Sequence, residues 1–351
     1  MAQYAPNAAT DGDSARPVPT SRVNPSPHPT RVVGTASIAI VERAYEAGVN
    51  FFDTSNNYNE GQSEIFLGRA VKRLSARHKM VISSKVHFPI DSNAGPNEQS
   101  NSRINIIRTC EESLKRLGTD YIDLYQLHRP SFHIPSEETL GALTDLVRQG
   151  KVRYIGCSTH PAWKVVEGIM VSEAKGLARY ISEQPPYNLL DRRVENELVP
   201  ACLAHGVGLI PYAPLAQGVL SGRYSDANTF PKDSRAARRG GVYIGRVNEP
   251  GIEIGRKLTT LANDAGITPA QLAVLWVKDQ PAVTAPIFGP RTMEQLEEIL
   301  PIMGMTLSAN LAAACDDLVP PGSAVTNYHN GCNWMKQQLQ VGESRVVAPA
   351  H

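Results

Sequence analysis

The stretch RINIIRTCEESLKRLGTDYIDLYQLH, residues 103–128, decides the fold because it places an amphipathic helix directly before a buried strand. Four apolar residues recur there at helical spacing: Ile104, Ile107, Leu114 and Leu117. Gly118 then supplies a helix C-terminus. The following run, residues 121–128, is apolar enough to predict a strand covered on both faces. Such a strand is typical of a parallel sheet with helices packed against it.

The same alternation continues along the chain. Helices are predicted at residues 37–48, 63–74, 136–149, 161–175, 191–205, 268–280 and 292–300. Strands are predicted at residues 49–55, 79–86, 121–128, 152–158, 179–184, 207–215 and 283–289. Strict alternation means parallel strands, in either a closed (β/α)8 TIM barrel or an open doubly wound sheet. No Gly-x-Gly-x-x-Gly follows any predicted strand, so a Rossmann phosphate site has no support. The eighth strand of a barrel must be the short, weak segment TRVVGTA, residues 30–36.

The ends of the chain are expected to lie outside the barrel. Residues 1–30 are rich in Pro, Ala, Ser and Thr and predict a disordered tail. Residues 31–320 are predicted to form the barrel, with a flap loop at 224–250 that is rich in Gly and Arg. Residues 321–351 are predicted to be a C-terminal helix and tail.

The composition favours a small-molecule partner. Lys+Arg number 35 and Asp+Glu 34, so no net charge attracts nucleic acid or an anionic membrane. No run approaches the roughly 18 apolar residues that span a bilayer, so no membrane insertion is expected. Five cysteines, Cys110, Cys157, Cys202, Cys315 and Cys332, form no Cys-x-x-Cys pair. They predict reduced thiols, no metal site and a cytoplasmic protein.

Four polar side chains stand at or just beyond the ends of three successive predicted strands. They are Asp53, Tyr58, Lys85 and His128. Because a barrel carries its functional residues at the carboxyl ends of its strands, these side chains are expected to meet in one mouth. Taken singly, each has an ordinary explanation as a turn, surface or loop residue. Their joint occurrence favours a site.

The chemistry of the four side chains points to proton transfer. A Lys85 ammonium close to Tyr58 favours the phenolate, and Asp53 keeps Lys85 charged, so Tyr58 is predicted to be an acid usable near neutral pH. Protonating an oxygen is half of a carbonyl reduction. The hydride must come from a nicotinamide cofactor, because no side chain supplies one. His128 would donate a hydrogen bond to the carbonyl oxygen and orient it.

Long motifs in order make the chain resemble the aldo-keto reductase family, in particular its potassium channel β-subunit-like and aryl-alcohol dehydrogenase-like group. The stretch NFFDTSNNYNEGQSEIFLGRAV, residues 50–71, is similar to the family's signature around a catalytic Asp and Tyr. Later matching stretches are GKVRYIGCST (150–159), EQPPYNLLDR (183–192), GLIPYAPLAQGVLSGRY (208–224) and APIFGPRTMEQLEE (285–298). The resemblance implies that Asp53, Tyr58, Lys85 and His128 form a catalytic tetrad with Tyr58 as the proton donor.

The same resemblance implies a cofactor site for NADPH (NADP+). Ser158 and Gln184 would bind the nicotinamide carboxamide, and Tyr212 would stack on its ring. The pyrophosphate would be held by Pro214, Leu215, Gln217, Gly218 and Arg223. Gly289 and Arg291 would open the last helix, with Arg291 capturing a 2′-phosphate. Gln295 and Glu298 would contact the adenine ribose.

Ordinary explanations remain for several cofactor residues. Tyr212 could fill the core, Arg291 could pair with Glu294, and Gln295 with Glu298 could form a solvated helix face. The flap at residues 224–250 could cover the pyrophosphate or be a plain surface loop.

The front of the chain departs from the family pattern. Gly34 and Thr35 are followed almost at once by helical residues, where family members carry a loop that touches nicotinamide and substrate. The sequence therefore predicts a wide substrate mouth, and both a monomer and a homo-oligomer stay open. Three functions fit: a carbonyl reductase, a slow NADPH-binding partner subunit, and a tailoring enzyme of a biosynthetic pathway that takes a bulky substrate.

Overall fold

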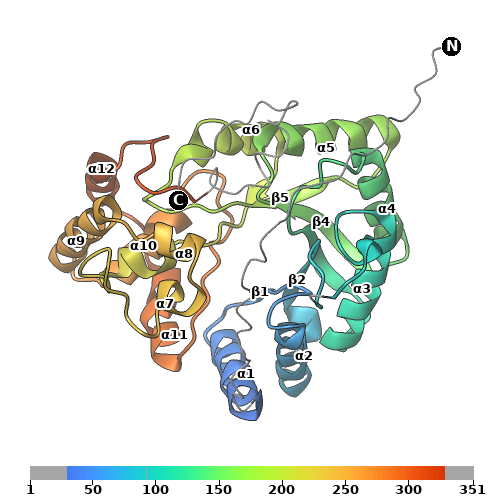
Figure 1. Cartoon of the computed structure of the whole chain (residues 1–351), viewed down its shortest axis with the longest axis horizontal. Helices are drawn as coiled ribbons and strands as arrows, with labels where there is room; N and C mark the ends of the chain where they lie inside the picture. The colour runs from blue at the N-terminus through green and yellow to red at the C-terminus, as the bar shows by residue number, and fades with distance from the viewer. Residues whose placement is uncertain (1–29, 92, 329–351) are drawn as a thin grey trace, which may run out of the picture.

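The computed structural model describes residues 30–91 and 93–328, and its centre is one parallel sheet of six strands. The strands are β1 (Phe51–Asp53), β2 (Val81–Val86), β3 (Ile122–Leu127), β4 (Val152–Ser158), β5 (Tyr180–Gln184) and β6 (Gly208–Leu209). Their order in the sheet is their order in the chain, and every neighbouring pair is parallel. The sheet curves into half of a barrel, as Figure 1 shows. The predicted (β/α)8 barrel class is confirmed.

Helices surround the strands. They are α1 (Thr30–Glu46), α2 (Gln62–Leu74), α3 (Arg103–Leu117), α4 (Ser136–Arg148), α5 (Ala162–Lys175), α6 (Leu198–His205), α7 (Arg235–Arg239), α8 (Val242–Gly245), α9 (Glu249–Asp264), α10 (Pro269–Lys278), α11 (Met293–Ile299) and α12 (Ala309–Leu318). In Figure 1 they form a ring around the strands, with α3 to α6 outside the sheet and α9 to α12 across the molecule from it. The main core fills the layer between the strands and these helices.

The helix ring closes even though the described part of the sheet does not. Ala44 of α1 packs in one cluster with Leu296 and Leu300, which lie in and just after α11. Arg43 and Glu297 add an ion pair of 2.6 Å between the same two helices. The first and last helices of the barrel therefore meet across the gap beside β1.

The prediction of a first strand at residues 30–36 is wrong, because these residues form the first two turns of α1. A strand beside β1 would have to reverse through a loop before the helix that follows it. The sequence provides no such loop between Thr35 and the helical run. A continuous helix satisfies these backbone groups internally, which an extended segment without a loop cannot do.

The predicted strand at residues 283–289 is reduced to a single bridge between Leu209 and Val283. The Thr284 N–H donates to the Leu209 carbonyl at 2.7 Å, and the Ile287 N–H donates to the Pro211 carbonyl at 2.7 Å. The segment follows β6 in a parallel direction. Pro286 within the segment and Pro290 directly after it have no backbone N–H to donate. The segment therefore does not form a regular strand.

Three further predictions need correction. Ile104 of α3 is 60% exposed, and the buried face of the helix carries Ile106 and Cys110 together with Leu117, which is buried as predicted. The helix predicted at 191–205 is broken into a short 3-10 turn, Arg193–Glu195, and α6. The flap region 224–250 contains the short helices α7 and α8.

The predicted tails lie almost wholly outside the described residues. Residues 1–29 and 329–351 are not described, and residues 321–328 contain no helix. In the described part of the chain, none of the helices combines the length and apolar character needed to cross a membrane.

Candidate active site at the carboxyl ends of the strands

Polar side chains occupy alternate positions of the strands on the inner face of the half-barrel. The register pairs Asp53 with Ser83, Lys85 with Gln126, and Ser158 with Gln184. Because successive strand residues point to opposite faces, these positions share one side of the sheet. Intervening residues such as Ile82, Tyr125 and Ile155 are buried on the other side. The strands thus carry a polar inner layer and a mostly apolar outer layer.

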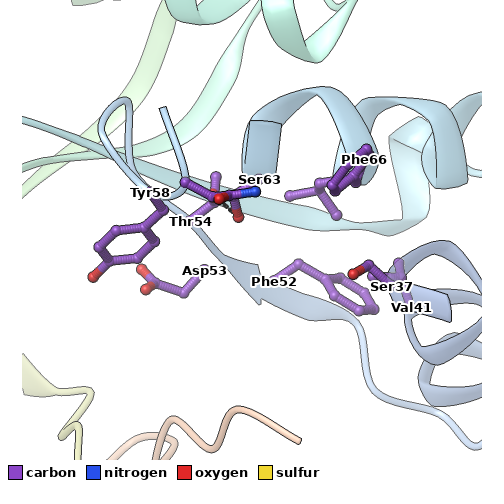
Figure 2. Close-up of a pocket in the computed structure, with 10 residues that line it drawn as sticks. Ser37, Val41, Phe52, Asp53, Thr54, Tyr58, Ser63 and Phe66 are labelled. Atoms are coloured by element: carbon purple, nitrogen blue, oxygen red, sulfur yellow. Dashed lines mark hydrogen bonds between the residues drawn. The ribbon is translucent and has the colours of Figure 1, made fainter. Parts of the chain in front are cut away.

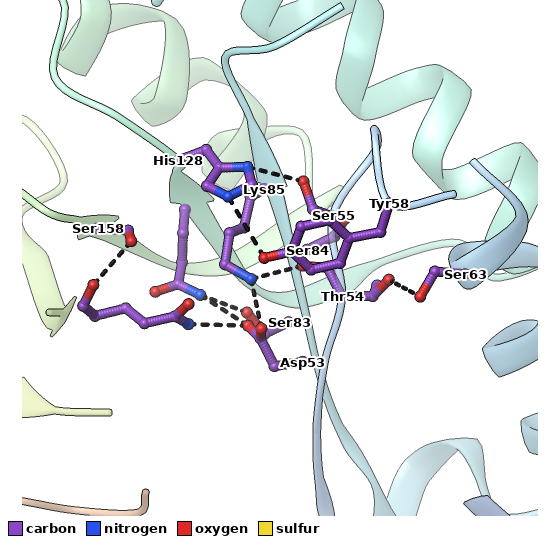
Figure 3. Close-up of polar contacts among 12 residues, drawn as sticks. Asp53, Thr54, Ser55, Tyr58, Ser63, Ser83, Ser84, Lys85, His128 and Ser158 are labelled. Carbon is purple, nitrogen blue, oxygen red and sulfur yellow. Dashed lines mark hydrogen bonds and ion pairs between the residues drawn. The ribbon is translucent and has the colours of Figure 1, made fainter. Parts of the chain in front are cut away.

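Asp53 and Lys85 form a buried ion pair at the centre of this inner layer. The Lys85 side chain is fully buried, and its Nζ donates to Asp53 Oδ2. The same ammonium donates to the Thr54 carbonyl at 2.8 Å. Asp53 Oδ1 accepts hydrogen bonds from the Gln126 amide at 3.2 Å and from the Gln184 amide at 3.1 Å. Figure 3 shows how side chains of separate strands converge on this carboxylate.

The ion pair keeps the buried lysine charged. Burial by itself would lower the pKa of Lys85, but the Asp53 carboxylate and then the Tyr58 phenol outweigh burial and raise that pKa above its ordinary value. Lys85 Nζ lies 5.1 Å from the centroid of the Tyr58 ring. A permanent positive charge therefore lies under the phenol.

Tyr58 and His128 complete the cluster. The Tyr58 hydroxyl lies 3.4 Å from His128 Nε2, and His128 Nδ1 lies 3.0 Å from Ser55 Oγ. His128 is buried, whereas Tyr58 is 39% exposed. Burial, followed by the charges of Lys85 and Arg129, lowers the pKa of His128 well below its ordinary value. The imidazole is therefore neutral at physiological pH and leaves the tyrosine as the solvent-facing member of the cluster.

A cavity of about 310 Å³ opens beside Tyr58 and Asp53. It lies between β1, α1 and α2, at the edge of the sheet where the predicted first strand is missing (Figure 2). Its apolar wall consists of Val41, Phe52, Phe66 and Leu67, and its polar lining includes Ser37, Thr54, Asn59 and Ser63. The cluster therefore faces an apolar recess on one side.

The two residues predicted to hold a carboxamide are brought together. Ser158 Oγ donates to the Gln184 carbonyl at 2.8 Å, and both side chains are buried at the ends of adjacent strands. The bond from Gln184 to Asp53 connects this pair to the ion pair. Tyr212, also predicted, lies beyond β6 in a parallel bridge to Pro186 and is partly buried.

The loop at residues 214–218 has an unusual backbone. Ala216 and Gln217 have positive φ angles of 47° and 61°, which cost non-glycine residues about 1 kcal/mol or more each. Gly218 has a φ of 95°, and a Cβ there would meet the Arg223 side chain at 2.8 Å. The loop continues from Pro214 and Leu215, so four of the predicted pyrophosphate residues lie around one tight turn, next to the fifth, Arg223.

Arg223 and Arg291 are held together by one acid. Asp233, in the flap region, forms an ion pair of 2.5 Å with Arg223 and another of 3.1 Å with Arg291. Arg291 does not pair with Glu294, the alternative considered from the sequence. Its own backbone N–H instead donates to Gln295 Oε1 at 2.8 Å. Two predicted phosphate contacts therefore lie on one surface bridged by a carboxylate.

The last helix begins later than expected. α11 starts at Met293 with Thr292 as its N-cap, so Gly289 and Arg291 precede the helix and do not open it. Gln295 and Glu298 lie on α11 and are partly exposed. The loop, not the helix terminus, presents Arg291.

Sequence reasoning missed three residues of this region. Gln126 bonds Asp53, Ser55 bonds His128, and Asp233 joins the two arginines. Gln126 could have been found, because a lone amide two residues before His128 shares its face of the strand. Asp233 had no detectable signal, since it lies in an irregular segment.

Comparisons with known proteins agree with this architecture. The model of the aldo/keto reductase family matches residues 24–320. The chain is 35% identical over 291 residues to the uncharacterized oxidoreductase YrpG of Bacillus subtilis, covering 81% of this chain and 87% of the relative. It is 34% identical over 281 residues to versiconal hemiacetal acetate reductase of Aspergillus parasiticus, with 75% and 80% covered. A putative voltage-gated potassium channel subunit beta of Schizosaccharomyces pombe is 34% identical over 264 residues, with 74% and 76% covered.

Proposed function

This chain belongs to the aldo/keto reductase family, and from that premise we propose that it reduces an aldehyde or ketone to an alcohol with NADPH, with Tyr58 as the proton donor. The observation that carries the proposal is the buried Asp53–Lys85 ion pair beneath the Tyr58 ring, next to a neutral His128. The direct test is to follow NADPH oxidation by the purified protein with a panel of aldehydes and ketones.

Each member of the cluster has a separate task. The Tyr58 hydroxyl gives its proton to the carbonyl oxygen, and the charge of Lys85 stabilises the phenolate that remains. Asp53 keeps Lys85 protonated in a buried place where a lone lysine would lose its proton. His128, neutral and 3.4 Å from the Tyr58 hydroxyl, orients the carbonyl oxygen toward that hydroxyl.

The residues present fit a nicotinamide dinucleotide. Ser158 and Gln184 would bind its carboxamide, Tyr212 would cover its ring, and residues 214–218 with Arg223 would hold the pyrophosphate. The positive φ angles of that loop and its glycine against Arg223 support this fit, because close backbone approach to phosphate needs such a turn. When bound, NADPH supplies the hydride.

Replacing Arg291 with Ala is expected to weaken NADPH binding about 10- to 100-fold and leave NADH binding unchanged, because a charged hydrogen bond contributes about 1.5–3 kcal/mol. Fluorescence titration with each cofactor measures both constants. Arg148→Ala, which changes an exposed side chain of α4, is the matched control. If the binding of NADPH and the binding of NADH weaken equally, Arg291 does not contact the 2′-phosphate.

The apolar recess beside Tyr58 supports a substrate with a bulky apolar part. Val41→Phe fills this recess and is expected to raise KM at least tenfold for a large aryl ketone while leaving a three-carbon aldehyde unaffected. Val41→Ala enlarges the recess and serves as the control, with no loss for either substrate. If both substrates respond equally to Val41→Phe, the recess does not receive the substrate.

Two relatives suggest narrower roles. The similarity to versiconal hemiacetal acetate reductase supports a tailoring step on a bulky biosynthetic substrate, which the apolar recess would accommodate. The similarity to a channel subunit beta supports a slow, NADPH-binding partner subunit as the alternative function. Cofactor binding without turnover of any tested carbonyl would favour the subunit. The free, buried thiols of the described cysteines support a cytoplasmic location.

A further inference from the structure

A second buried polar cluster lies at β4 and β5, separate from the tetrad. It consists of Cys157, His160 and Glu183, all of which are buried. Cys157 and Glu183 are register partners on adjacent strands, and His160 follows the end of β4. One donor atom from each of the three side chains lies within 4.8 Å of the other two.

The cluster lies on the outer face of the sheet. Ser158 and Gln184, the next residue of each strand, belong to the polar inner face, so Cys157 and Glu183 point the other way, toward the helices. That layer is mainly apolar: Ile155 and Leu209 occupy it on neighbouring stretches of strand. A thiol, an imidazole and a carboxylate gathered there need a specific explanation.

Glu183 has an unused ligand atom. Its Oε1 accepts the His160 backbone N–H at 3.0 Å, whereas its Oε2 is buried without a hydrogen-bond partner among the described residues. A buried carboxylate oxygen without a hydrogen-bond partner is costly, and a cation beside Oε2 would offset that cost.

His160 is prepared in the way that metal-binding histidines usually are. Its Nδ1 lies 2.9 Å from the Ser158 carbonyl, which can only accept, so Nδ1 carries the proton and Nε2 carries the lone pair. A backbone carbonyl that fixes the second ring nitrogen is a recurrent feature of zinc sites.

We propose that Cys157, His160 and Glu183 bind a zinc ion. Thiolate, imidazole and carboxylate are all zinc ligands, and three protein ligands leave one position for a water molecule. Zinc bonds of about 2.0–2.3 Å place tetrahedral ligands about 3.3–3.8 Å apart, so donor atoms that lie within 4.8 Å of one another must approach by at most about 1.5 Å. Binding releases the proton of the Cys157 thiol.

The proposed zinc would fix the strand ends behind the predicted carboxamide residues. It links β4, the loop after β4, and β5, while Ser158 and Gln184 lie on the opposite face of the same strands. The sequence predicts no metal here, because the third ligand comes from the next strand and is separated from His160 by a whole helix. The effect is structural, so metal loss should lower thermal stability more than it alters the chemistry of Tyr58.

The test measures metal directly, on full-length protein expressed in zinc-supplemented medium. Elemental analysis is expected to find about one zinc per chain in the wild type and in Cys110→Ser, whose buried cysteine lies on α3. Cys157→Ser and Glu183→Gln are expected to lose at least tenfold in zinc occupancy. Cobalt substitution should give a thiolate-to-cobalt charge-transfer band in the wild type and none in Cys157→Ser. His160→Gln, in a loop, serves if the strand variants do not fold.

The proposal is overturned if wild-type protein contains no zinc and Co²⁺ produces no charge-transfer band. It is equally overturned if zinc is present but its amount is unchanged in folded His160→Gln, since the ion would then lie elsewhere. Zinc content and the cobalt spectrum do not depend on turnover. A failure here is therefore distinct from a failure of the reductase proposal.

Discussion

Tyr58→Phe is expected to lower kcat for carbonyl reduction by about 10²–10⁴-fold, the usual contribution of a positioned general acid. The change removes the hydroxyl that lies beside His128 Nε2 on the ring above the Lys85 charge. The ring stays, so its packing over Lys85 is retained. The loss should fall on kcat, while the dissociation constant of NADPH stays within about twofold of the wild type.

A control variant makes this result specific. Tyr154→Phe removes a hydroxyl from an exposed tyrosine of β4 and should leave kcat unchanged. Steady-state rates with NADPH and a substrate from the carbonyl panel give the values for both variants. Tyr58→Phe with wild-type kcat would mean that another group protonates the carbonyl oxygen.

Asp53→Asn is expected to destabilise the protein by about 3–5 kcal/mol, because it leaves the fully buried Lys85 without a countercharge. Urea unfolding at neutral pH measures this free energy. Carbonyl reduction should fall as well, since Lys85 would no longer hold its proton firmly under Tyr58. Adding Lys85→Met to Asp53→Asn should recover much of the stability and none of the activity.

The pH dependence of the free energy of unfolding tests whether the buried Lys85 is charged. In the wild type the pKa of folded Lys85 is raised, so the ion pair stabilises the protein below the unfolded lysine pKa and this stability is lost as pH rises through the folded pKa. The stability difference between wild type and Asp53→Asn should therefore narrow in strongly alkaline solution. Glu253→Gln, which breaks an exposed pair, should cost less than about 1 kcal/mol at any pH. A difference that widens with pH would contradict a charged Lys85.

Local patterns predicted the parts of the fold that local physics determines. The helix ending at Gly118 and the strand after it follow from periodicity and a C-terminal glycine, and both are present. The segment at 30–36 is predicted as a strand because a closed barrel needs an eighth strand and no other segment before the first helix is available. The segment is helical because no loop follows it and because the sheet beside β1 is not complete. Both reasons depend on tertiary structure and not on local propensity. Ile104 was assigned to the core because apolar spacing alone does not say which face meets the sheet.

The candidate site likewise contains residues that local sequence predicts and residues that only the tertiary structure brings together. Asp53, Lys85 and His128 could be predicted because each ends an apolar strand, and the structure brings them together with Tyr58. The carboxylate of Asp233 between two arginines could not be predicted, because an irregular flap positions it. His160 and Glu183 lie close together because β4 pairs with β5. The order of the strands in the sequence suggests this pairing, but it does not give the register of the two strands.

The central claim is that this barrel, whose described sheet is open beside β1, still holds a working NADPH site. Titration of the purified protein with NADPH and with NADH, followed by cofactor fluorescence, tests it most directly. The account predicts saturable NADPH binding that is at least tenfold tighter than NADH binding. Folded protein that binds neither cofactor would contradict the account, because the residues from Ser158 to Arg291 would then not form the site proposed for them.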